Sequence, residues 1–245
     1  MITKTYKIAD KIISISSLYD EVHTLCRDYA FDGQPQIFVT CSDKDIAAER
    51  EKSDRNAEAE GRVPQKFRDS YLETLALYRK IADNMVDSDC FLFHGSAIAV
   101  DGAAYLFTAK SGTGKSTHTA LWRRLFGDRA VMVNDDKPLI RVQGGRAIIY
   151  GTPWNGKHRL GCNIAVPLKA VCILTRAQEN RIERTDKRTA LPMLIQQTHR
   201  PEDPKKTAKT LRLIDSLAGS ISLYRLGCNM EIQAAQIAHN ALKEF

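Results

Sequence analysis

Residues 103–126 read AAYLFTAKSGTGKSTHTALWRRLF, and this stretch decides the fold expected for the chain. It begins with an apolar run typical of a buried strand, continues through a turn with two glycines, and ends in an amphipathic run typical of a helix. A strand, a glycine-containing turn and a helix in immediate succession form the setting in which a loop can bind phosphate groups. The stretch therefore predicts an α/β domain with an anion site at the start of its helix.

The segment AKSGTGKS at 109–116 matches the phosphate-loop pattern G-x-x-x-x-G-K-[ST] except at its first position, where Ala109 replaces glycine. Alanine costs little there if it has ordinary β angles. Gly112 and Gly114 permit backbone angles that let successive N–H groups point at phosphate oxygens, and the helix dipole adds positive potential. The predicted nucleotide-binding residues are Lys110, Ser111, Gly112, Thr113, Gly114, Lys115, Ser116 and Thr117.

A pair of aspartates completes the predicted ATP and Mg²⁺ site. Lys115 is expected to bridge the β- and γ-phosphates and to act in catalysis, and the Ser116 hydroxyl to bind Mg²⁺. Asp135-Asp136 follow the apolar run VMVN, where a neighbouring strand tip would bring a carboxylate opposite Ser116. We interpret Asp136 as the metal ligand and Asp135 as the catalytic base for an attacking hydroxyl. A turn without chemical function is the alternative.

The composition is that of an ordinary folded protein. The chain has 245 residues, 43% hydrophobic and 27% charged. The first twenty residues interleave polar and apolar positions, and no apolar run is long enough to span a bilayer, so we expect a cytoplasmic protein with no membrane partner. The six cysteines are scattered without zinc-ligand spacing, which predicts reduced thiols.

Charge divides the chain into two expected domains. Residues 1–89 carry 13 Lys/Arg and 17 Asp/Glu, whereas residues 90–245 carry 23 and 12. We expect a small N-terminal α+β lobe over 1–89 and a nucleotide-binding domain over 90–245. The basic excess is typical of an anionic ligand, with solvated surface charge as the alternative. Because the basic residues are dispersed and no recognised motif accompanies them, we expect no nucleic-acid partner.

The pattern of apolar runs predicts a mixed sheet. Strands are expected over 3–16 and 36–41, an exposed helix or mobile loop over 42–63, and a helix from Pro64 to Met85. Short apolar runs follow Asp89, with hairpin turns at Asp101-Gly102 and Gly144-Gly145. Later elements are strands at 170–176 and 221–226 and helices near 187–199, 205–218 and 230–243.

The loop GTPWNGKHRLG at 151–161 places three basic or titratable side chains in a row between glycines. A loop of this kind on a β framework is a natural place for substrate contacts. We therefore predict substrate contacts from Lys157, His158 and Arg159. A solvated loop would explain the same charges.

His94-Gly95, the loop AKSGTGKS and Asp135-Asp136 together resemble the catalytic core of HPr kinase/phosphorylase and, more distantly, ATP-dependent phosphoenolpyruvate carboxykinase. The resemblance covers roughly residues 91–142 and implies a P-loop core with a mixed sheet. It also implies phosphorylation of a serine hydroxyl with ATP and Mg²⁺, with His94 close to the transferred phosphate and therefore catalytic. The paired aspartates would include the base that permits the reverse, phosphorolytic reaction. Because relatives form hexamers, a homo-oligomer is an alternative to a monomer.

Two departures from that family leave the phosphoacceptor open. GTPWNGKHRLG stands where the family has a glycine-rich segment, and the first 89 residues do not resemble its usual N-terminal domain. The acceptor is then a Ser or Thr of a protein or peptide, or a small-molecule metabolite. Two other classes fit the same residues. One is a nucleotide-dependent regulatory module without transfer chemistry, and the other is a carboxykinase-like enzyme in which Lys157 and Arg159 hold a small carboxylic acid.

Overall fold

The computed structural model describes residues 1–59, 61, 63–156 and 158–243. The chain divides into two compact units, Met1–Asn84 (unit 1) and Met85–Phe245 (unit 2). The boundary between the units lies slightly before the domain division expected between residues 89 and 90. The expected division into two domains stays a prediction.

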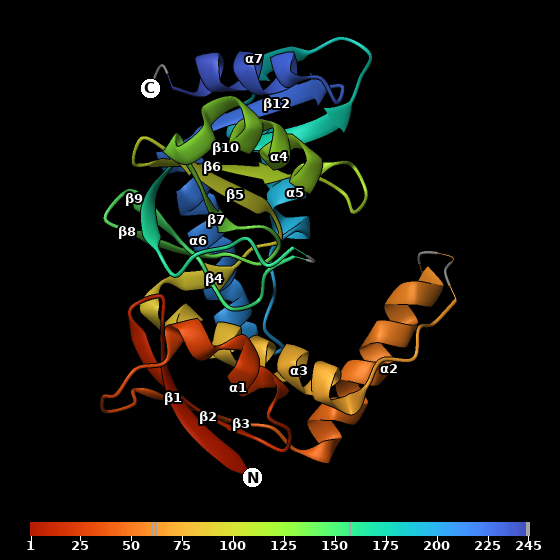
Figure 1. Cartoon of the computed structure of the whole chain (residues 1–245), viewed down its shortest axis with the longest axis vertical. Coiled ribbons are helices and arrows are strands. Elements are labelled where there is room, and N and C mark those ends of the chain that lie inside the picture. Colours follow the sequence, from red (N-terminus) through yellow and green to blue (C-terminus); the bar gives the residue numbers. More distant parts are fainter. Residues whose placement is uncertain (60, 62, 157, 244–245) are drawn as a thin grey trace. The chain divides into compact units, whose positions relative to one another are not determined.

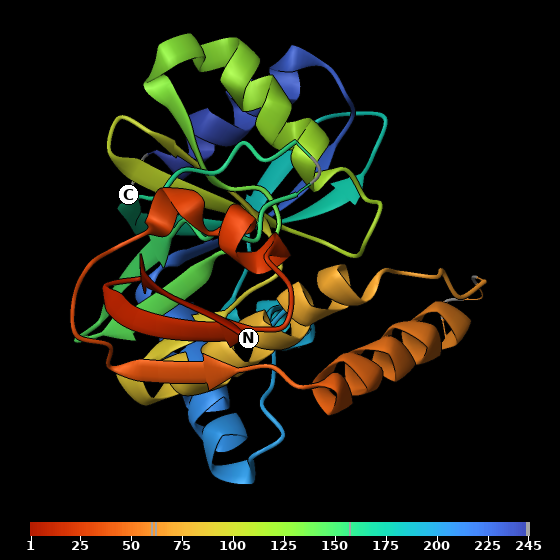
Figure 2. The ribbon, with the colours of Figure 1, turned by 60° about the horizontal axis from the view of Figure 1, so that its bottom comes forward.

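Unit 1 contains a three-stranded sheet in the order β1-β2-β3 (Figure 2). The strands are β1 (Ile2–Ile8), β2 (Lys11–Ser17) and β3 (Ile37–Thr40). The single strand expected over 3–16 is wrong, because Ala9 and Asp10, with φ of 46° and 61°, turn the chain into an antiparallel hairpin. Two left-handed residues in succession match the twist of a hairpin, but alanine is an unusual residue there, so no turn signal marked it.

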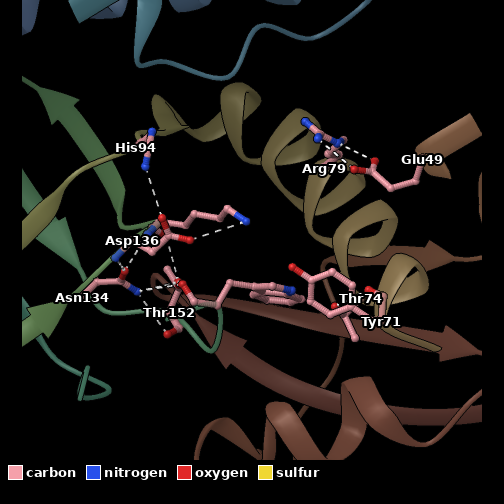
Figure 3. Close-up of polar contacts among 10 residues, drawn as sticks. Glu49, Tyr71, Thr74, Arg79, His94, Asn134, Asp136 and Thr152 are labelled. Carbon is pink, nitrogen blue, oxygen red and sulfur yellow. Dashed lines mark hydrogen bonds and ion pairs between the residues drawn. The ribbon is translucent and has the colours of Figure 1, made fainter. Parts of the chain in front are cut away.

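Three helices follow or interrupt these strands: α1 (Glu21–Leu25), α2 (Asp43–Ala59) and α3 (Asp69–Met85). The helix alternative for 42–63 is therefore the correct one. The start expected at Pro64 is wrong, because the carbonyl of Arg68 accepts the first bonds of α3, from Tyr71 and Leu72. Ion pairing joins α2 to α3, since Arg79 Nε donates to Glu49 Oε2 over 2.6 Å (Figure 3).

Unit 2 is built on a nine-stranded mixed sheet with the main order β4-β8-β9-β10-β6-β5-β7. A further strand, β12, pairs with β10 and β11. The strands are β4 (Cys90–Leu92), β5 (Ser96–Val100), β6 (Ala103–Thr108), β7 (Ala130–Asn134), β8 (Leu139–Gln143), β9 (Arg146–Tyr150), β10 (Ala165–Arg176), β11 (Arg181–Arg184) and β12 (Ser222–Cys228). The expectation of an α/β protein with a mixed sheet is confirmed.

Strand β10 joins two kinds of pairing. Its first residues pair antiparallel with β9. It runs parallel to β6 from Leu168, with a register shift between Leu168 and Ala170, and parallel to β12 from Ala170. The strand expected over 170–176 thus begins earlier, at Ala165. The earlier part was hidden because Pro167 and Lys169 interrupt the apolar run there.

Both expected hairpin turns are confirmed. Asp101 and Gly102 have φ of 51° and 81°, and Gly144 and Gly145 have φ of 57° and 72°, as two-residue hairpin turns require. The apolar run FLFHGSAIAV, in contrast, does not form one strand. It breaks at 93–95 into β4, which pairs with β8, and β5, which lies between β6 and β7. His94 lies in the break.

Helices cover both faces of this sheet (Figure 1). They are α4 (Lys115–Phe126), α5 (Lys187–Gln196), α6 (Pro204–Ser220) and α7 (Ile232–Leu242). Alternation along β6 sends Leu106 into the core with α5 and α6, and Phe107 into the core with α4 and α7. Burial on both faces explains the uninterrupted apolar runs of the central strands. Among the described residues, no helix is long and apolar enough to cross a membrane.

Burial of His118 generates a pH-dependent stability in unit 2. Its side chain is enclosed by Phe107 and Trp122, and burial lowers the pKa of the imidazole to about 4, below an ordinary value of about 6.5. The folded protein therefore excludes a proton that the unfolded chain binds. The free energy of unfolding should lose about 3 kcal/mol from this group as pH falls from about 6.5 to 4, and nothing above about pH 7.

The variant His118→Gln keeps an acceptor for Trp122 Nε1, which donates to His118 Nε2 over 3.0 Å. It should remove the loss of unfolding free energy that His118 causes as pH falls from about 6.5 to 4. Urea unfolding followed by tryptophan fluorescence measures it, because Trp122 and Trp154 both lie in unit 2. A variant with the wild-type slope would contradict the prediction.

Candidate active site

Residues Ala109–Gly114, here called the glycine loop, connect β6 to α4. Gly112 and Gly114 have φ of 75° and 122°, which residues with side chains rarely adopt. A Cβ at Gly112 would meet no atom within 4 Å, so this glycine is required by backbone conformation and not by space. Ala109 is buried and does not have a positive φ, which explains why glycine is not needed at the first position of the pattern.

Lys115 begins α4, and its ammonium folds back into the glycine loop, where Nζ donates to the carbonyl of Ala109 over 3.1 Å. Burial lowers the pKa of Lys115, and the charges of Asp136 and Asp135 oppose this effect. The structure therefore brings these three predicted residues close enough to interact electrostatically. The helix N-cap is Gly114, which has no side chain to accept from the first-turn N–H groups, so they are available to an anion.

Arg176, at the end of β10, binds the outer side of the glycine loop. It donates from Nη2 to the carbonyl of Gly112 and from Nε to that of Thr113 over 3.4 Å. Since a peptide group is planar and trans, a Thr113 carbonyl that faces Arg176 turns the N–H of Gly114 the opposite way. Arg176 thus orients a loop amide. Our sequence reasoning missed it because the contact is long-range and its only signal was a basic residue directly after an apolar strand.

Asp135 is buried, with 6% of its surface exposed. Ser96 Oγ donates to Asp135 Oδ1 over 3.3 Å and lies 2.9 Å from Thr119 Oγ1 on α4. On the other side Gly156 packs so closely that a Cβ there would lie 2.5 Å from Asp135 Oδ2. One carboxylate is thereby held by β5 and by the 151–161 loop.

Asp136 pairs with His94, whose Nε2 lies 3.3 Å from Asp136 Oδ1 (Figure 3). Lys137 Nζ lies 3.6 Å from the other carboxylate oxygen. Burial acts to raise the pKa of Asp136, but the hydrogen bond with His94 and the charges of Lys137 and Lys115 outweigh it and hold that pKa below its usual value. Asp136 is consequently a carboxylate at neutral pH, and it forms a dyad with His94.

Asn134 fixes the turn that carries both aspartates. Its Oδ1 accepts from the backbone N–H groups of Asp136 and Lys137 over 2.8 and 2.7 Å. Its Nδ2 donates to Thr152 Oγ1 over 2.9 Å and to the carbonyl of Trp154 over 3.3 Å (Figure 3). Its side chain is fully buried. The only sequence signal that Asn134 would hold this turn was the position of an asparagine at a strand end.

A cavity of about 530 Å³ opens beside the first turn of α4. It is lined by Ser116, Thr117, Thr119, Ala120, Arg123, Met132, Asp135, His158 and Leu160. Of the predicted substrate residues, His158 lines this cavity, Arg159 is exposed with φ of 48° and does not line it, and Lys157 lies outside the described residues. Lys110 and Ser111 are exposed on the glycine loop.

The residues present fit a magnesium ion bound together with phosphate. Ser116 and Asp135 line one cavity and offer oxygen ligands. Among the described residues, no group of three or more His, Cys, Asp or Glu side chains could hold a metal by itself. Mg²⁺ in phosphoryl-transfer sites takes one or two carboxylates and completes its coordination with phosphate and water, so this small ligand set is sufficient.

Comparison with protein families matches the chain to the family described as SynChlorMet cassette protein ScmC, over residues 66–205. No protein of curated function matches the chain. Among solved structures, the Hpr(Ser) kinase/phosphatase from Coxiella burnetii matches with 11% identity and a TM-score of 0.34. That match covers 61% of this chain and 95% of the other.

Removal of the Asn134 side chain should destabilise unit 2 strongly. Asn134→Ala leaves buried groups of the aspartate turn and of Thr152 without partners, so we expect a loss of about 3 kcal/mol in the free energy of unfolding. Urea unfolding measures it. Gln143→Ala is the matched control, since this amide is exposed at the end of β8 and should change stability by less than about 0.5 kcal/mol. Equal effects in the two variants would refute the role of Asn134.

Proposed function

We propose that this chain, which belongs to the ScmC family of SynChlorMet cassette proteins, is a Mg²⁺-dependent kinase that transfers the γ-phosphoryl group of ATP to a hydroxyl acceptor. One observation carries the proposal: a buried lysine at the end of a glycine loop lies within electrostatic reach of two carboxylates. A buried cation between an amide-rich loop and paired carboxylates suits a polyphosphate whose terminal group is to be transferred.

The glycine loop and Lys115 would hold the phosphates. The N–H groups of the first turn of α4 and of Gly114 supply donors, and Lys115 supplies a charge that can leave the Ala109 carbonyl for a phosphate oxygen. The order of His94, glycine loop and aspartate pair along the chain is that of HPr kinase/phosphorylase, and this resemblance supports a kinase reaction of that type.

We assign the two aspartates in the opposite way to the sequence interpretation. Asp135 and Ser116 line the same cavity, so these two residues would hold Mg²⁺, which when bound supplies positive charge to the phosphate oxygens. Asp136 is left as the base, because it is ionised at neutral pH and pairs with His94. A carboxylate of this kind accepts the proton of the attacking hydroxyl in other kinases.

In the proposed transfer, the bond that forms is matched by a bond that breaks, and Asp136 takes up the released proton. The acceptor oxygen forms a bond to the γ-phosphorus as the bond to the β,γ-bridging oxygen breaks, ADP leaves, and the hydroxyl proton passes to Asp136. His94 would hold the Asp136 carboxylate in position through its Nε2. Ser96 holds the Asp135 carboxylate and Asn134 holds the backbone N–H of Asp136, so little reorganisation would be needed during transfer.

Two substitutions test the division of roles. Asp135→Asn should raise the Mg²⁺ concentration needed for ATP binding by about tenfold. Asp136→Asn should leave Mg·ATP binding within about threefold of wild type while reducing transfer by at least about a hundredfold. Titration calorimetry gives the binding constants, and radiolabelled ATP with hydroxyl acceptors gives the transfer rates.

The remaining outcomes distinguish the alternatives. If Asp136→Asn raised the Mg²⁺ concentration needed for ATP binding and Asp135→Asn reduced transfer, Asp136 would be the metal ligand and Asp135 the base. Mg·ATP binding that disappears in Lys115→Met, without transfer to any acceptor, would indicate a nucleotide-dependent regulatory module. No binding dependent on Lys115 would refute the proposed function.

Arg176 should contribute to nucleotide affinity without touching the reacting atoms. Arg176→Met removes both bonds to the loop carbonyls, so we expect ATP to bind about tenfold more weakly with an unchanged free energy of unfolding. Arg181→Met is the matched control, because Arg181 is an exposed arginine on the nearby strand β11. Calorimetry that gives the two variants the same affinity would contradict the positioning function.

A further inference from the structure

We propose that the phosphoacceptor is an extended, acidic polypeptide segment that binds in a groove between α4 and β7. This inference rests on the proposed kinase function and specifies its substrate class. It is drawn from two neighbouring cavities of unit 2, the sheet edge beside them and one arginine that has no ion pair within the described part of the chain.

The groove is continuous along α4. The first cavity begins at Ser116 and Asp135, as described above. A second cavity of about 500 Å³ shares Arg123, Met132 and Leu160 with it and extends to Cys162. A hydroxyl placed at the carboxylates would therefore have room for flanking residues along one direction. A small metabolite would leave the second cavity unused.

The groove lies on the acceptor side of the glycine loop. Asp135 and Asp136 follow β7, at one edge of the sheet, whereas Arg176 ends β10, on the other side of β6. A polyphosphate with its terminal group at the carboxylates would extend across the loop toward β10. The space along β7 is then left for the group that attacks from beyond the terminal phosphate.

The edge of β7 favours a polypeptide. Among the described strands, β7 pairs only with β5. Its other edge already accepts a main-chain hydrogen bond from outside the sheet, because the backbone N–H of Cys162 lies 3.2 Å from the carbonyl of Met132 and 3.3 Å from that of Val133. Ala130 and Val131 continue this edge and line the second cavity. An exposed edge of this kind binds extended peptides through main-chain hydrogen bonds.

Arg123 selects acidic side chains. It is exposed, it lines both cavities, and it forms no ion pair with another described residue. Asp128 at the far cavity is the one acidic residue there, and residues 90–245 carry 23 basic against 12 acidic side chains. A carboxylate of the acceptor would pair with the Arg123 guanidinium at a fixed spacing from the phosphorylated serine.

A charge reversal tests the proposal. Wild type, Arg123→Glu and Arg124→Glu are compared on peptides that each hold one serine and one Asp, Lys or Ala at varied positions, with radiolabelled ATP. Wild type should prefer an acidic residue at particular spacings by about tenfold in kcat/KM. Arg123→Glu should lose this preference and favour lysine at the same spacings. Arg124→Glu should behave as wild type, because Arg124 is exposed on α4 but lines neither cavity.

Cys162 offers a second, independent measurement. It is the exposed cysteine of the six, and Cys228 is half-buried. In a Cys228→Ser background, a bulky maleimide on Cys162 should abolish peptide phosphorylation while calorimetry shows unchanged Mg·ATP binding. Unchanged peptide rates after labelling would overturn the groove.

Failure of the proposed groove and failure of the proposed kinase function would give different results. Transfer to peptides with no dependence on acidic residues or on Arg123, or efficient transfer to small metabolites alone, overturns the groove and leaves the kinase standing. Mg·ATP binding with no transfer to peptides or metabolites overturns both.

Discussion

The turn that carries Asp135 and Asp136 is held by a neutral, fully buried side chain that satisfies the backbone around the two carboxylates. Asn134 accepts from two amides of the turn and donates to the loop that begins at Thr152, so both ends of its amide are used. Two adjacent carboxylates repel each other, and a turn that carries them would relax away from the loop without such a fixed support. The positions of Asp135, Asp136 and, through the dyad, His94 all depend on this support.

Hydrogen bonds and packing also connect the site to the core that contains Phe107 and Trp122. Ser96 reaches Asp135 from β5, and Thr119 reaches Ser96 from α4, so a hydroxyl pair links the carboxylate to the helix that begins at Lys115. That helix is anchored by Trp122, which is fully buried against Phe107 of β6. Movement of α4 relative to the Asp135 carboxylate would therefore require repacking of the core, which is costly. The site is arranged on rigid elements.

Local patterns predicted the parts of the site that are contiguous in the chain. The glycine loop, the aspartate pair, both glycine hairpins of unit 2 and the mixed sheet could be recognised because their signals lie within a few residues. Arg176, Ser96 and Gly156 could not, because each acts through a long-range contact that no short pattern encodes. The hairpin at Ala9-Asp10 was missed for a different reason: its left-handed residues include an alanine, so the usual turn residues were absent.

Strand β10 has a consequence for how the protein can be divided. A fragment that stops before Ala165 would keep the histidine, the glycine loop and both aspartates, and would satisfy any motif search. It would nonetheless expose the full edge of β6 and lack the arginine that holds the loop. The smallest part of unit 2 that can fold by itself is thus larger than its recognisable motifs, and gene fragments that retain only those motifs should encode insoluble products.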